Sequence, residues 1–299
     1  MTDPSAERTF MQRLLYTALR TASDATGRLG HKNLRRIAMG LGAALWHSLP
    51  SRRALAIRNI RDHLSVPEAE AKAIARESFN HNALSFLEAA FIPYCRCEAP
   101  LFTCDAENTL STMKAGGRPV VVSTGHLGAW ELLATLHGVI CPMDKIGSAV
   151  VRRYGNQVFN DFMIRQRGFH GNQIIGHRNA VMPVLRILRQ QGTVIFLVDH
   201  HTGSSESLRI PFLGEEAAVN MGPALLAIRG KALIFPLCIL RKGEGYLLHI
   251  EPEALDPLAL EGDNDARIRS AATFYTRAME RMIRLAPEQW FWMHNRWKK

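Results

Sequence analysis

The sequence predicts an α/β fold, in which a mixed and mostly parallel sheet is flanked by helices, together with a helical N-terminal region. Short apolar runs rich in β-branched residues alternate with helical patterns from about residue 118 onward, the order typical of sheets whose strands are joined by helices. The part of the chain before them carries mainly helical spacing of its apolar residues. The 299 residues, of which 47% are apolar, fit a folded globular protein and exclude a disordered or collagen-like chain.

Three helices are expected in the N-terminal third. The first begins at Asp3-Pro4, a cap residue followed by Pro at the first helical position, and is broken by Gly27 and Gly30. The second occupies about residues 34–49 and ends at Pro50-Ser51. The third follows the Ser-Val-Pro-Glu stretch at 65–68, which has the pattern of a capping box, and reaches about residue 92.

The charge of the chain points to an anionic partner. It carries 37 Lys and Arg against 27 Asp and Glu, a net charge of +10, which favours nucleic acid, a phospholipid surface or an acidic protein. Residues 1–65 hold 11 of the basic and 4 of the acidic residues at helical apolar spacing, a combination that favours a membrane surface over nucleic acid. We expect residues 1–64 to attach to an anionic membrane surface and residues 65–299 to form the α/β domain. Helices packed only on the core are the alternative.

The apolar runs are too short to span a bilayer. The longest, residues 37–46 and 232–240, fall well below the roughly 20 residues that a spanning helix requires. Asp3 and Glu7 do not fit a signal peptide, so attachment is expected to be monotopic or peripheral. The five cysteines are odd in number and lack C-x-x-C spacing, which indicates a chain with reduced thiols.

The α/β region is expected to place its chemistry where strands end. The expected strands lie at residues 120–122, 145–151, 193–198, 232–240 and 246–250, and the expected helices at 129–136, 156–167, 179–190 and 267–285. In parallel sheets covered on both faces, sites form at the carboxyl ends of the strands. His126 and Asp199 each follow an expected strand.

His126 and Glu131 are the candidate catalytic pair. Gly125 and Gly128 make a tight turn around His126 easy and leave backbone open to a ligand. Five residues on an ideal helix turn about 140° beyond a full circle, so the two side chains meet only if His126 lies in the turn and Glu131 in the first helical turn. The carboxylate would then orient the imidazole, whose other nitrogen removes a proton. A purely structural His–Glu pair is the alternative.

The stretch from Gly125 to Leu132 resembles motif one of the glycerolipid and lysophospholipid acyltransferases, and most of all the branch of lipid A lauroyl and myristoyl transferases. Further motifs of that branch follow in order: Val151-Arg152, Asn156, Arg165-Gln166-Arg167, Asp199 with residues 200–203, residues 210–214, Ile234-Phe235-Pro236, and residues 286–298. The resemblance extends from about residue 52 to the end. The chain departs from the branch in lacking a full hydrophobic anchor. It also carries His201 where a second acidic residue often stands.

The resemblance implies transfer of a fatty acyl group from an acyl carrier protein or coenzyme A thioester to a hydroxyl of a phosphorylated glycolipid such as a lipid A precursor. The resemblance also implies that this reaction takes place at the cytoplasmic face of a bacterial inner membrane. His126 would be the general base and Glu131 its orienting group. Arg165 would stabilise the oxyanion, with the backbone N–H groups of the 125–128 turn as alternatives.

The resemblance also implies binding roles for Arg152, Asn156 and Arg167, which would position phosphates or sugar hydroxyls. Asp199 would steady the loop or contact His126. No metal is expected, since the adjacent His200 and His201 would point to opposite faces of a strand. No nucleic-acid partner is expected, because the sequence carries no recognised nucleic-acid motif, and no cofactor is expected. Open alternatives are another glycolipid or lysophospholipid as acceptor, or a thioesterase that uses water.

Overall fold

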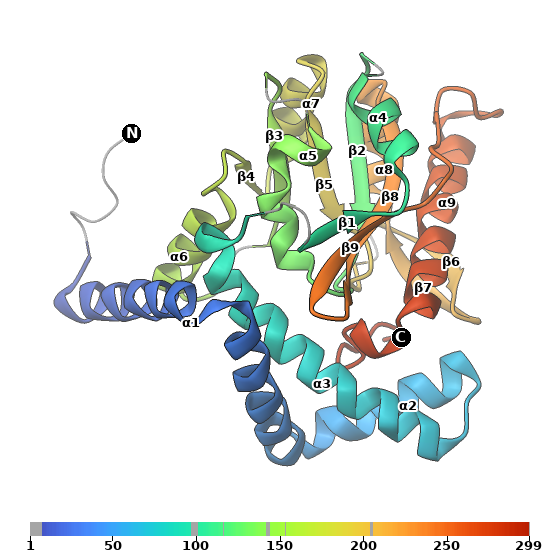
Figure 1. Ribbon diagram of the computed structural model, residues 1–299. Coiled ribbons are helices and arrows are strands. Elements are labelled where there is room, and N and C mark those ends of the chain that lie inside the picture. Colours follow the sequence, from blue (N-terminus) through green and yellow to red (C-terminus); the bar gives the residue numbers. More distant parts are fainter. Residues whose placement is uncertain are drawn as a thin grey trace.

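The computed structural model describes residues 8–96, 101–115, 117–141, 144–152, 154–203 and 206–298. Its centre is a seven-stranded sheet in the order β1-β9-β8-β2-β5-β3-β4 (Figure 1). The strands are Phe102–Cys104 (β1), Val120–Thr124 (β2), Gly147–Val151 (β3), Gln173–Gly176 (β4), Thr193–Leu197 (β5), Leu233–Lys242 (β8) and Gly245–Ile250 (β9). Neighbouring strands are parallel except for the antiparallel pair β8–β9. The predicted α/β class with a mixed, mostly parallel sheet is confirmed.

Helices cover both faces of the sheet, and a separate antiparallel hairpin, Ser207–Phe212 (β6) with Glu215–Asn220 (β7), lies beside it. The longer helices are Phe10–Ser48 (α1), Pro50–Leu64 (α2), Glu68–Phe91 (α3), Glu107–Ala115 (α4), Gln157–Arg167 (α6), Val181–Arg189 (α7), Gly222–Gly230 (α8) and Asn264–Leu285 (α9). Short helical segments are Ile92–Tyr94 (η1), Trp130–Thr135 (η2), His137–Ile140 (α5) and Pro287–Gln289 (η4).

Strand β2 shows why the sheet is buried on both sides. Val120 and Val122 belong to the core that the sheet shares with α3, α4 and η2, whereas Val121 belongs to the core shared with α7, α8 and α9. Successive strand residues point to opposite faces, so an uninterrupted apolar run is what a strand between two helical layers requires.

The N-terminal helices differ in detail from expectation. The expected cap at Asp3-Pro4 lies outside the described residues, and α1 begins at Phe10 with Thr9 as its cap. Only Gly30 leaves helical geometry (φ 70°, ψ 164°) and bends α1, whereas Gly27 stays helical. A side chain at Gly27 would clash with the Tyr94 ring, 2.5 Å from the Cβ position, so close packing explains that glycine.

The expected capping box at residues 65–68 is wrong. Ser65 has left-handed backbone angles (φ 56°, ψ 42°) and ends α2, and α3 starts after Pro67 with no side-chain cap. The pattern predicts the start of one helix, but its first residue, Ser65, belongs to the end of the helix before it. The end of the second expected helix is confirmed, because α1 stops at Ser48 and Pro50 starts α2.

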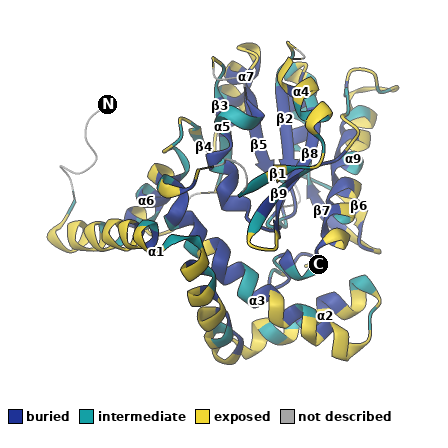
Figure 2. Cartoon of the chain, viewed as in Figure 1, coloured by how far each residue is buried: buried dark blue, intermediate teal, exposed yellow. Residues whose placement is uncertain are grey.

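The first half of α1 extends away from the sheet and past α6 (Figures 1 and 2). It exposes large apolar side chains, namely Phe10 (78% exposed), Met11 (68%), Leu14 (55%) and Leu15 (42%). Further along, α1 packs against α3, where Leu34 and Ala38 are buried. Among the described residues, no helix is both long enough and apolar enough to cross a bilayer.

Candidate active site

The candidate site lies where β2 and β5 end. These strands run parallel with Thr124 beside Leu197, so the residues that follow them emerge at the same edge of the sheet. The chain leaves β2 through the turn at residues 125–128. Gly128 has a φ of +61°, and a Cβ there would lie 2.0 Å from the Ile239 carbonyl oxygen. Only glycine fits this close backbone approach.

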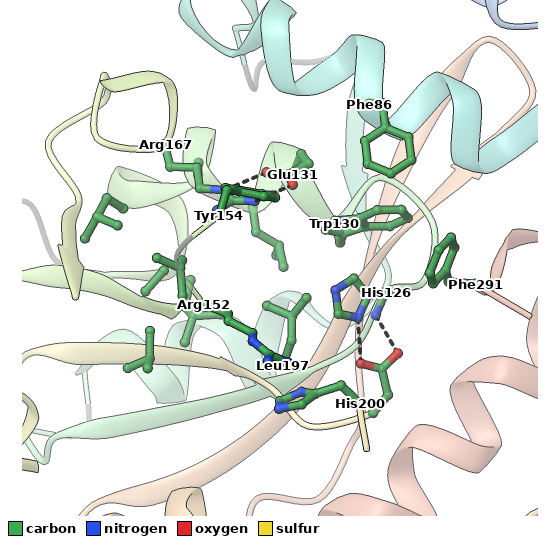
Figure 3. A pocket seen from close by; sticks show the side chains of 18 of the residues that line it. Phe86, His126, Trp130, Glu131, Arg152, Tyr154, Arg167, Leu197, His200 and Phe291 are labelled. Atoms are coloured by element: carbon green, nitrogen blue, oxygen red, sulfur yellow. Dashed lines mark hydrogen bonds and ion pairs between the residues drawn. The ribbon is translucent and has the colours of Figure 1, made fainter. Parts of the chain in front are cut away.

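His126 is held by Asp199. The imidazole Nδ1 lies 2.9 Å from Asp199 Oδ1, and the backbone N–H of His126 donates to Asp199 Oδ2 over 2.7 Å (Figure 3). The Trp290 indole N–H donates to the same Oδ2 over 2.8 Å. Asp199 is buried, whereas 34% of the His126 side chain is exposed. Within the described residues Nε2 has no hydrogen-bond partner, so the ring keeps one nitrogen for a ligand.

The ionisation of this pair follows from the contacts. Burial alone would lower the pKa of His126, but the charge and hydrogen bond of Asp199 outweigh it and raise the pKa above its ordinary value. Burial would raise the pKa of Asp199, yet the His126 charge and the hydrogen bonds from His126 and Trp290 hold it well below its usual range. Asp199 is therefore a permanent carboxylate beside a titratable imidazole.

Glu131 does not orient His126, which corrects the expectation from the H-x4-E spacing. It forms a two-pronged ion pair with Arg167, whose Nε and Nη2 lie 2.8 Å and 2.6 Å from the two carboxylate oxygens. Arg167 Nη2 also donates to the Tyr154 hydroxyl over 3.1 Å. Segment η2 is a 3-10 helix, and it places the Glu131 side chain beside Arg167, away from the His126–Asp199 contact (Figure 3).

Both pairs line one cavity of about 400 Å³. Its polar side chains include His126, Asp199, Glu131 and Arg167, and much of the remaining wall is apolar, with Leu133, Ala134, Ile174, Ile195 and Leu197. An apolar cavity with a few converging polar groups is typical of a site that binds an amphipathic small molecule.

Arg152 also lines this cavity and is exposed. Figure 3 shows its side chain reaching toward the side where Leu197 and His200 lie. Among the described residues it has no hydrogen-bond or ion-pair partner, in contrast to Arg167.

Two other predicted residues are not brought to the cavity. Asn156 caps α6, where its Oδ1 accepts from the Phe159 N–H over 3.0 Å. Arg165 is exposed and contacts Gln166, because residues two apart on a helix are separated by about 200° and Arg167 takes the cavity side. Arg165 is therefore not among the residues that line the cavity, where its expected oxyanion role would place it.

The turn offers fewer backbone donors than expected. The His126 N–H binds Asp199, and the Gly128 N–H donates to the Gln289 carbonyl over 3.0 Å. The Ser85 hydroxyl donates to the Gly128 carbonyl over 3.0 Å. These bonds fix the turn but leave neither of the two N–H groups for a ligand.

The sequence alone does not assign Trp290, Tyr154 or Ser85 to the site. Trp290 belongs to the closing signature at residues 286–298, so its place in a motif was the one signal available. In the described part of the chain no group of three or more His, Cys, Asp or Glu side chains is arranged to hold a metal ion.

Comparison with known proteins places the chain in a family. The family model of the bacterial lipid A biosynthesis acyltransferases matches residues 11–299. The lipid A biosynthesis lauroyltransferase of Escherichia coli (strain K12) is 26% identical over 273 residues, which cover 88% of this chain and 84% of the relative. The palmitoleoyltransferase of the same organism is 27% identical over 267 residues, covering 86% and 82%. The chain is an acyltransferase and belongs to the bacterial lipid A biosynthesis acyltransferase family.

Proposed function

We propose that the protein transfers a fatty acyl group from an acyl thioester to a hydroxyl of a phosphorylated glycolipid such as a lipid A precursor, with His126 as the general base. The observation that supports this most strongly is the placement of His126: Asp199 holds one ring nitrogen, and the ring lines a largely apolar cavity. The thioester is carried by acyl carrier protein or coenzyme A.

Asp199 sets the direction of proton transfer. It accepts the Nδ1 proton, so Nε2 carries the lone pair that removes the proton of the acceptor hydroxyl. The hydroxyl oxygen attacks the thioester carbonyl carbon, and the resulting tetrahedral species collapses with loss of the thiolate. The imidazolium then returns its proton to the thiolate. No covalent enzyme intermediate is needed, because the thioester is already activated.

Arg152 is the donor we assign to the oxyanion, in place of Arg165 and the turn N–H groups. It is a guanidinium that lines the cavity without an ion-pair partner among the described residues, so its charge is available to the developing negative charge. Losing one oxyanion donor typically costs about 100- to 1000-fold in rate.

The Glu131–Arg167–Tyr154 group positions the acceptor. Arg167 uses Nε and Nη2 within this group, which leaves Nη1 for a sugar hydroxyl or phosphate. Burial would lower the pKa of Arg167, but Glu131 raises it above its usual range, so the guanidinium keeps its charge. The apolar wall around Leu133 and Ile195 receives the acyl chain.

Residues 1–64 attach the enzyme to the cytoplasmic face of the inner membrane. Supporting this are the exposed apolar side chains of α1, with Phe10 and Met11 the most exposed, and the basic residues among them, such as Arg13 and Arg20. Such a surface inserts apolar groups below lipid headgroups while arginines meet the phosphates.

The decisive experiment compares wild-type protein with His126→Ala. Purified protein is incubated with acyl thioester and a lipid A-type acceptor, and products are measured by mass spectrometry. We expect a rate loss of about 100- to 10,000-fold, the usual contribution of a general base. His47→Ala, which removes an exposed histidine at the end of α1, is the control and keeps the wild-type rate. Full activity of His126→Ala, or free fatty acid as the main product of the wild type, would overturn the proposal.

A further inference from the structure

A second cavity of about 560 Å³ adjoins the first. The segments that follow β3 and β4 form its wall, and the lining residues are Arg152, Tyr154, Gly155, Gly176, His177, Arg178 and Asn179. Arg152 and Tyr154 line both cavities, so the second cavity continues the candidate active site rather than forming a separate place on the surface.

Strand pairing brings its two arginines to one edge of the sheet. Strands β3 and β4 run parallel with Val151 beside Gly176, and the His177 N–H donates to the Val151 carbonyl over 2.9 Å. Arg152 follows β3 directly and Arg178 follows β4 by two residues. The sequence separates these arginines by more than twenty positions, but the register fixes both at the wall of this cavity.

The charge of this cavity is unbalanced. No acidic residue is among its described lining residues, and within the described chain neither Arg152 nor Arg178 has a hydrogen-bond or ion-pair partner. Other arginines near the sheet are paired, as Arg118 is with Asp256. Two unpaired guanidinium groups at one cavity repel each other unless an anion joins them.

Helix α7 adds to the same potential. It begins at Val181, just beyond Asn179, and no side chain caps its first turn. The free N–H groups and the dipole of a helix N-terminus attract anions. This contribution supports the two arginines and would not define a site without them.

We propose that this cavity binds the phosphate group of the glycolipid acceptor, with Arg178 as its main ligand. The inference rests on the proposed function and specifies where the acceptor lies. The acceptor hydroxyl must reach His126, so a phosphate several bonds away on the sugar needs its own compartment, and the cavity beyond Arg152 supplies one. The planar fork of arginine suits phosphate oxygens in a bidentate contact.

The test measures steady-state kinetics of the full chain with a phosphorylated lipid A-type acceptor. Arg178→Ala is expected to raise the acceptor KM about tenfold, the lower end for a lost charge-assisted hydrogen bond at an exposed site, with kcat within about twofold and the donor KM unchanged. Arg178→Lys recovers part of the loss because it keeps the charge without the fork. The matched control is Arg189→Ala, an exposed arginine at the other end of α7, which keeps the wild-type KM.

The second part of the test repeats the kinetic measurements with a dephosphorylated acceptor. Removing the phosphate should raise the wild-type KM by a similar factor, and Arg178→Ala should then have no further effect. The inference is overturned if Arg178→Ala leaves the acceptor KM unchanged, if its penalty persists on the dephosphorylated acceptor, or if the donor KM rises instead, which would assign the cavity to a phosphate of the carrier. A wild-type chain that acylates no acceptor would overturn the proposed function, and this inference with it.

Discussion

Two glutamate–arginine pairs in this protein have the same chemistry and different surroundings. Glu131–Arg167 forms part of the cavity wall, with 5% and 15% of the side chains exposed. Glu88–Arg241 joins α3 to β8, with 0% and 3% exposed. In each pair the guanidinium contacts both carboxylate oxygens, and in each a tyrosine hydroxyl takes part, Tyr154 in the first and Tyr246 in the second.

The deeper pair is a closed network. Tyr246 donates to Glu88 over 2.7 Å, and Arg241 Nη2 donates to the Ser85 hydroxyl over 2.7 Å, which in turn reaches the Gly128 carbonyl. Burial would raise the pKa of Glu88, but the charge of Arg241 and hydrogen bonds from His31, Arg241 and Tyr246 lower it. An ion pair of this kind supports the fold when protein groups use all of its donors. It serves binding when, like Arg167, it keeps a donor at a cavity.

The largest effect is expected from breaking the deeper pair alone. Arg241→Met leaves Glu88 buried without its counter-charge, which typically lowers the free energy of unfolding by about 3–5 kcal/mol. Urea denaturation followed by circular dichroism measures this. The double variant Glu88→Leu with Arg241→Met should recover much of the loss, because no charge then remains buried. If Arg241→Met alone is as stable as the wild type, the Glu88–Arg241 pair does not stabilise the fold.

A smaller loss of stability and a clear loss of activity are expected from Glu131→Gln. The free energy of unfolding should fall by only about 1–2 kcal/mol, whereas acyl transfer should slow about tenfold or more, because Arg167 loses its fixed position. Arg165→Ala, on the other side of the same helix, is the control and should stay within about twofold. If Glu131→Gln destabilises the protein as much as Arg241→Met, the distinction between the two pairs fails.

The smallest effect is expected in the pH dependence of the rate, which distinguishes Asp199 from Glu131 as the partner of His126. His126 acts as a base only when neutral, so kcat/KM rises with pH through its raised pKa. Asp199→Asn should move this rise to lower pH because the main cause of the raised pKa is gone, and Glu131→Gln should move it less. Rate profiles between pH 5 and 9 measure both. A larger displacement in Glu131→Gln would restore Glu131 as the partner of His126.

The raised pKa of His126 also makes the free energy of unfolding depend on pH. A raised pKa in the folded state means that protonation of His126 favours folding. This contribution is complete below the ordinary pKa of 6.5 and is lost as pH rises through the folded-state value. The pH dependence of unfolding in that window should become weaker in Asp199→Asn.

The sequence predicted β2, β5 and β8 because they are apolar on both faces, and β9 because buried apolar residues alternate along it. The runs at 120–122, 193–198, 232–240 and 246–250 correspond to β2, β5, β8 and β9. Strands β1 and β4 have only three and four residues. These are too few for an alternation of apolar and polar residues to be recognised in the sequence. The hairpin β6–β7 carries Arg209, Pro211, Glu215 and Glu216, which interrupt any apolar alternation.

At the site, the sequence identified His126, Glu131, Arg152, Arg167 and Asp199. It left open whether Asp199 contacts His126, and it did not predict that Glu131 pairs with Arg167. Whether Asp199 reaches His126 depends on the register of β2 against β5, and whether Arg165 or Arg167 faces the cavity depends on the rotation of α6. Glu88 and Arg241 are 153 positions apart and match no motif, so no local pattern could have joined them.

The hydrogen bonds that fix the turn around His126 have a consequence for the order in which the protein chain assembles its site. The Gly128 N–H binds the Gln289 carbonyl, the Phe291 N–H binds the His126 carbonyl, and the Trp290 indole binds Asp199. All three partners lie in residues 289–291, beyond β9, which ends at Ile250, and beyond α9, which ends at Leu285. The histidine turn is therefore fixed only after this late segment of the chain has been synthesised and has packed against it.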